Sequence, residues 1–124
     1  MSTNYFLITL IGLGAVLAGG LGSALRLALS HWHGRLPWGI LVGNSVASLV
    51  VGLTYSTQNG EVASFVLSLG FAGGLSTFSS WAAQTVHYYR QGENRKGTYN
   101  LLLNLLLPAL CVIAGMILSP LLLK

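Results

Sequence analysis

Four long apolar stretches dominate this chain, and short polar connections separate them. A helix that crosses a bilayer needs about 20 mostly apolar residues. The connections "SHWHGRLP", "STQNGE" and "RQGENRKG" contain turn-forming residues and most of the formal charges. The pattern therefore predicts four membrane-spanning helices in a single domain, at about residues 5–29, 38–55, 62–89 and 98–123.

The composition points to the same class of protein. Hydrophobic residues make up 53% of the 124 residues and charged residues 6%, whereas a soluble domain carries about 25% charged residues. A soluble chain of this size leaves much of its surface exposed and could not cover so much apolar area. We therefore expect an all-α, multi-pass protein of the inner or plasma membrane. A bacterial source is also expected. The first stretch is too long for a signal peptide and is expected to remain as a span.

The third apolar stretch contains an unusual segment, "AGGLSTFSSW", at residues 72–81. Non-helical backbone at membrane depth is tolerated only where it is buried in protein or lines a water-filled path. The Gly73–Gly74 pair is the best place for such a break. Carbonyls of the unwound backbone could coordinate a cation, and the N-terminus of the half-helix that follows could face an anion. Alternatively, the glycines form a packing face and the hydroxyls bond to the preceding turn. The residue types leave both interpretations open.

Three amides also fall within the spans. Asn44 lies in the middle of the second span, and Asn100 and Asn104 share one face of the fourth because they are four residues apart. Such amides either join helices or line a polar path. The spans contain no Asp, Glu or Lys, which argues against a proton relay. A small multidrug-type exporter would need an acidic residue in the first span, which has none.

Other function classes have little support in the sequence. No nucleophile–base pair or metal-ligand cluster is present, so we do not expect an enzyme. The basic residues form no patch with interleaved aromatics, which argues against nucleic-acid binding. Small residues recur every four positions, as in Gly14/Ala18/Gly22 and Gly39/Gly43/Ala47, and such rows let membrane helices approach closely. Four short spans enclose little polar path alone, so an oligomer is expected.

The basic residues are distributed unequally between the two membrane faces. Four spans put the first and third connections on one face and both termini on the other. The first face carries Arg35, Arg90, Arg95 and Lys96, with Arg26 just inside it, and the second carries Lys124. The positive-inside rule therefore predicts cytoplasmic first and third connections and external termini.

Three segments resemble the signatures of the Fluc (CrcB) fluoride channels: "GGLGSALR" at 19–26, "PWGILVGNSVAS" at 37–48 and "GFAGGLSTFSSW" at 70–81. The resemblance implies a third span broken in mid-membrane and two subunits packed as an antiparallel dimer with two fluoride pores. It also implies a structural sodium ion at the dimer centre, held by the carbonyls of Gly73 and Ser76. The residues implied to line the fluoride path are Asn44, Phe78, Ser79, Ser80, Trp81, Asn100 and Asn104, with Arg26 at the vestibule.

The chain departs from the family pattern at several of these positions. The family's second pore phenylalanine is Trp81, and a threonine usual in the second segment is Ile40. The tyrosine and serines usual in the fourth span are Asn100, Asn104 and Pro108. These departures keep open an alternative, a non-conducting or partly conducting structural subunit. In an antiparallel homodimer, two copies of one sequence must insert in opposite orientations. The charge bias favours a single orientation and therefore a heterodimer with a paralogue over a homodimer.

Overall fold

The computed structural model describes residues 2–55 and 62–122, with side chains from residue 4 onward. Within these ranges, four helical segments are long and apolar enough to cross a membrane. They are Asn4–Ser30, Trp38–Tyr55, Val62–Arg90 and Asn94–Leu122. The prediction of an all-α, four-span membrane protein is confirmed.

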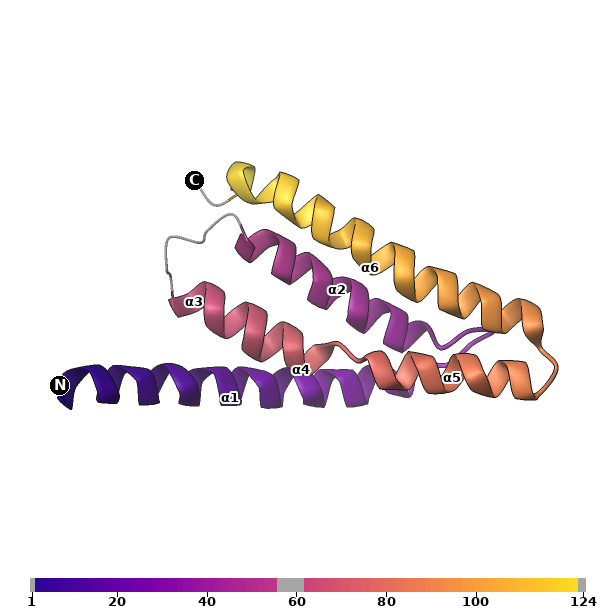
Figure 1. Ribbon diagram of the computed structural model, residues 1–124, viewed down its shortest axis with the longest axis horizontal. Helices are drawn as coiled ribbons and strands as arrows, with labels where there is room; N and C mark the ends of the chain where they lie inside the picture. The colour runs from indigo at the N-terminus through magenta and orange to yellow at the C-terminus, as the bar shows by residue number, and fades with distance from the viewer. Residues whose placement is uncertain (1, 56–61, 123–124) are drawn as a thin grey trace.

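The four spans run alternately up and down (Figure 1). Helix α1 covers Ser2–Ser30 and helix α2 covers Trp38–Tyr55, while the last span is helix α6, Asn94–Leu122. The third span is divided into α3 (Val62–Phe65), the π-helix η1 (Val66–Ala72), α4 (Gly73–Leu75) and α5 (Phe78–Arg90). The start of α1 and the end of α6 lie at one end of the bundle, opposite the α1–α2 and α5–α6 connections.

Helix α1 packs against η1 and α4 at backbone-to-backbone distance. A Cβ added to Gly22 would lie 2.9 Å from the backbone nitrogen of Leu75, and one added to Gly74 would lie 2.9 Å from the carbonyl carbon of Gly19. Glycine at these positions therefore lets the two segments touch along their main chains. The hydroxyl of Ser23 donates to the Gly74 carbonyl at 3.4 Å and joins the same two segments.

Helix α2 packs most closely on α6. A Cβ on Gly52 would lie 3.0 Å from the Cα of Gly115, so glycines also allow this crossing. Next to it, the fully buried Ser119 hydroxyl donates to the carbonyl of Leu53 at 2.6 Å. The buried apolar core is small, and Ala47, Ala72 and Leu75 form a cluster within it. Most large apolar side chains face outward instead, as expected for a surface that contacts lipid or another subunit.

The third span is broken as predicted, but the expected position of the break is wrong by about one turn. Gly73 and Gly74 are helical, and the chain leaves the helix at Ser76 (φ −79°, ψ 154°) and Thr77 (φ −153°, ψ 122°). Gly74 is needed for its approach to α1, and no atom lies within 4 Å of a Cβ added to Gly73. The packing interpretation therefore applies to Gly74, which packs against α1. The interpretation as a break applies to the segment after Leu75, which is extended.

The fourth helix begins at Asn94, four residues before the expected start of the span. The sequence "GENRKG" looks like a loop because it is charged and contains two glycines. Only Gly92 has a positive φ, 76°. The Gly97 N–H donates to the carbonyl of Glu93 at 3.1 Å, and Lys96 pairs with the Glu93 carboxylate at 2.8 Å. The first turn of α6 is thus a charged extension of an otherwise apolar helix.

Candidate functional site

The break between α4 and α5 has a buried polar partner on α2. The amide oxygen of Asn44 accepts the Thr77 N–H at 2.7 Å, and its Nδ2 donates to the Thr77 carbonyl at 3.2 Å. Asn44 and Thr77 are 7% and 9% exposed. One side chain thus satisfies both main-chain groups of a residue that has left the helix, as unsatisfied backbone groups at membrane depth are costly.

The same bonds change which donors reach the carbonyls before the break. In a continuous α-helix the Thr77 N–H would bond to the Gly73 carbonyl and the Ser80 N–H to the Ser76 carbonyl. Instead, the Thr77 N–H goes to Asn44, and the Ser80 N–H goes to the Thr77 hydroxyl at 3.3 Å. Neither carbonyl therefore receives its helical donor. Gly73 is exposed and Ser76 is half-buried.

Thr77 also begins the next half-helix. Its hydroxyl caps α5 by accepting the Ser80 N–H, and it lies 3.1 Å from the Ser80 hydroxyl and 3.4 Å from the Ser79 hydroxyl. This threonine was not among the expected site residues. Threonine is a favoured N-cap residue, and its occurrence within an apolar span is the sequence signal that could have located both the cap and the break.

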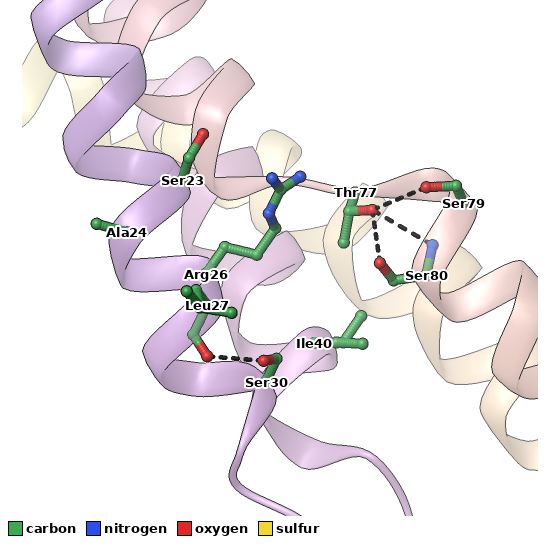
Figure 2. A pocket seen from close by; sticks show the side chains of 9 residues that line it. All are labelled: Ser23, Ala24, Arg26, Leu27, Ser30, Ile40, Thr77, Ser79 and Ser80. Atoms are coloured by element: carbon green, nitrogen blue, oxygen red, sulfur yellow. Dashed lines mark hydrogen bonds between the residues drawn. The ribbon is translucent and has the colours of Figure 1, made fainter.

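These hydroxyls open into a pocket of about 580 Å³ between α1, the start of α2 and the start of α5. Figure 2 shows Arg26 extending from α1 towards the break. Within the described residues, Glu93 is the only carboxylate side chain, and it pairs with Lys96. Because no carboxylate in this part of the chain pairs with Arg26, the pocket is electropositive. Its lining residues are Ser23, Ala24, Arg26, Leu27, Ser30, Ile40, Thr77, Ser79 and Ser80.

The two aromatic residues after the break have different environments. Phe78, the first residue of α5, is 73% exposed and points away from its own protomer, whereas Trp81 is 8% exposed and lies within the bundle. Their ring centroids are 4.9 Å apart with an interplanar angle of 75°, an edge-to-face contact. The contact between Phe78 and Trp81 therefore joins a ring buried in the protomer to a ring on its outer surface.

The two amides of α6 lie inside the protomer. Asn104 accepts a hydrogen bond from Nδ2 of Asn44 at 3.2 Å, and its own Nδ2 donates to the Asn100 carbonyl and side-chain oxygen at 3.0 and 3.1 Å. Asn100 in turn donates to the Thr85 hydroxyl at 2.8 Å and to the Trp81 carbonyl at 3.2 Å. Five of the seven residues expected at the path are thus joined to one another through bonds and a ring contact, and Ser79 and Ser80 are joined to them through Thr77.

Fold and site together define a small four-span membrane protein in which hydroxyls of the broken third span and Arg26 of α1 line one pocket. The family model described as CrcB-like protein, Camphor Resistance (CrcB), matches residues 13–116. The chain is also similar to proteins named fluoride-specific ion channel FluC. One from Parabacteroides distasonis is 34% identical over 84% of this chain and 88% of the relative. One from Pyrococcus abyssi is 35% identical over 84% and 91%. One from Aeromonas salmonicida is 37% identical over 82% and 90%. The chain belongs to the CrcB family.

Proposed function

We propose that this chain is a subunit of a fluoride-selective channel through which cytoplasmic fluoride leaves the cell passively. The observation that carries the proposal is the broken third span, which brings three hydroxyls to a pocket also lined by Arg26 of α1, in a chain of the CrcB family. The relatives are named as channels rather than enzymes, in agreement with the expectation of no catalysis.

The chemistry of the pocket suits a small, strongly hydrated anion. Fluoride only accepts hydrogen bonds, so hydroxyl donors and the electropositive edges of aromatic rings must replace the water it loses. Ser79 and Ser80 supply hydroxyls, and Phe78 supplies a ring edge on the outer surface of the protomer. Arg26 raises the local anion concentration from the wall of the pocket. Conduction requires binding that is weak enough for the ion to leave.

The proposed assembly is an antiparallel dimer. Phe78 is largely exposed although it lies within a span, so a second subunit beside it would complete the path. The basic residues favour one orientation in the membrane. We therefore favour a paralogue of opposite orientation as the partner over a second copy of this chain.

We also propose a structural sodium ion at the centre of this dimer. The carbonyls of Gly73 and Ser76 fit such an ion because neither receives its helical donor. Ser76→Ala keeps the carbonyl and should leave the dimer intact, whereas replacing sodium with N-methylglucamine should shift dimers towards monomers in detergent. A dimer fraction that is insensitive to sodium would contradict this assignment.

Fluoride efflux from liposomes tests the channel function. The purified chain is reconstituted alone and together with its genomic paralogue, and a fluoride electrode records release. Release of fluoride well above that of chloride, from vesicles that contain this chain, is the expected result. No release in either preparation, from protein that is shown to be dimeric, would contradict the proposal.

A specific observation favours a second candidate, a structural subunit that supports a paralogue's pore. Ile40 lines the pocket beside the hydroxyls and offers no donor to an anion. Efflux from the mixed preparation, which persists when Phe78 of this chain is changed to isoleucine, would identify this structural role.

A further inference from the structure

The two halves of the broken third span pack against different helices. The first half, η1 and α4, lies mainly against α1, whereas α5 packs mainly on α6 and makes a smaller contact with α2. On its other side, the start of α5 borders the pocket that separates it from α1. A continuous helix passes its axial position from one half to the other, but the extended segment at Ser76 and Thr77 does not. The position of α5 therefore depends largely on its contacts with α6.

The connection between α5 and α6 is a tight, hydrogen-bonded turn. The Gly92 N–H donates to the Tyr89 carbonyl and the Glu93 N–H to the Tyr88 carbonyl, at 3.1 and 3.0 Å, which is the Schellman pattern of a helix end. Gly92 supplies the positive φ of 76° that this pattern requires. Helix α6 begins directly afterwards, at Asn94. The connection is therefore too short to take up a change in the relative position of the two helices.

One tyrosine side chain of α5 lies against α6 beside this turn. A Cβ added to Gly97 would lie 3.1–3.2 Å from ring carbons of Tyr89, so the ring lies close to the main chain of α6. Gly97 is buried, and the Tyr89 hydroxyl lies 3.0 Å from the Thr98 hydroxyl. A larger residue in place of Gly97 would have to displace the ring. We call Tyr89, Gly97 and Thr98 the α5 clasp.

We propose that the α5 clasp is a positioning device for the ion path, which holds the axial and rotational position of α5 on α6. Ser79 and Ser80 line the pocket from the first turn of α5, and Phe78 begins the helix. Because α5 is a single half-helix of 13 residues, a displacement at Tyr89 is carried to these side chains, about three turns away. This inference rests on the proposed function for its effect on efflux, whereas the position of α5 is measured independently of it.

The test measures the distance between α1 and α5 without fluoride. Nitroxide labels are placed at Ala28→Cys on α1 and Ala83→Cys on α5, two exposed positions, in a Cys111→Ser background. Labelled protein is diluted with unlabelled protein, so pulsed dipolar spectroscopy records the distance within one protomer. Tyr89→Ala should shift the mean distance by about 2 Å, the size of a typical helix displacement. Tyr89→Phe keeps the ring against Gly97 and should retain the wild-type distance.

Tyr99→Ala is the matched control. Tyr99 is a tyrosine near the start of α6 but is 60% exposed, so its removal should leave the distance unchanged. An unchanged distance in Tyr89→Ala, or an equal shift in Tyr99→Ala, would overturn the inference. If Tyr89→Ala does not assemble, Gly97→Ala is the second variant. Its added Cβ displaces the Tyr89 ring, so the same shift is expected and its absence has the same meaning.

Fluoride efflux at equal amounts of dimer tests the consequence for the ion path. Efflux from Tyr89→Ala should fall by about fivefold, because small displacements of positioned groups are costly, and Tyr89→Phe should retain efflux. Normal efflux from a protein whose α5 has shifted would overturn the role of the clasp in the ion path. A wild-type protein that releases no fluoride would contradict the proposed function, and the distances would still decide whether the clasp positions α5.

Discussion

At the scale of single residues, Phe78 and Trp81 divide the aromatic surface after the break between exterior and interior. Trp81 is buried within the bundle, and Phe78 makes an edge-to-face contact with it while most of the Phe78 ring faces outward. An outward ring within a membrane span can contact lipid or a partner, and only the second arrangement gives it a role beside an ion. Substitution of Phe78 separates these roles.

Phe78→Ile should leave dimer formation intact and reduce fluoride efflux by roughly tenfold, because isoleucine fills similar space but has no electropositive edge. Efflux from liposomes and size-exclusion chromatography are the measurements. Phe65→Ile is the matched control, since Phe65 is also an exposed phenylalanine of the third span, in α3. Wild-type efflux from a dimeric Phe78→Ile protein would remove this ring from the path.

At the scale of elements, the two adjacent glycines of the third span have different functions. Gly74 lies against the main chain of α1, while a Cβ on Gly73 would meet nothing within 4 Å in the protomer. The π-helix that precedes them has wider turns than an α-helix, and both its Gly70 and the following Gly74 face α1. This close contact holds the first half of the broken span in place.

Gly74→Ala should therefore destabilise the protomer by about 1–3 kcal/mol, because the new Cβ overlaps the Gly19 carbonyl region. Gly73→Ala, the neighbouring control, should change protomer stability by less than about 0.5 kcal/mol. Unfolding in mixed micelles with increasing dodecyl sulfate gives both values. Equal destabilisation by the two substitutions would show that the α1 contact is not what requires glycine here. A bulky residue at Gly73 should act on the dimer instead.

At the scale of the whole molecule, the charged connections predict one orientation in the membrane. Arg35 lies in the α1–α2 connection, and Arg90 and Arg95 flank the α5–α6 connection at the same end of the bundle. The opposing positive charge, Lys124, lies outside the described residues. Because each basic residue resists translocation, the bundle should insert one way, with this end in the cytoplasm.

Cysteine labelling in intact cells measures this orientation. In a Cys111→Ser background, Gln91→Cys should be protected from a membrane-impermeant maleimide and Gln58→Cys should be labelled. Gln91 directly follows α5 at the basic end, and Gln58 lies in the second connection, outside the described residues. Similar labelling at both positions would mean dual topology and would favour a homodimer over a pair of paralogues. Labelling after permeabilisation provides the control for accessibility.

The sequence by itself determined the number of spans and their approximate limits, and it offered a break in the third span as one of two interpretations, which the family resemblance favoured. These follow from local properties: the length of each apolar run, and the cost of placing glycines and hydroxyls in the middle of a membrane helix. The motifs in three segments also pointed to the family before any contact was known. Such patterns are properties of consecutive residues and require no knowledge of which residues are in contact in the folded protein.

Only the tertiary structure decided where the break lies and what the asparagines do. The extended segment is at Ser76 and Thr77 because Asn44, 33 positions earlier in the chain, supplies the bonds that the helix loses there. Asn100 and Asn104 share a helix face in the sequence, but that face could have lined a path or joined helices. Which role an amide takes depends on the acceptors that other helices bring within about 3 Å of it, and those are set by how the spans pack.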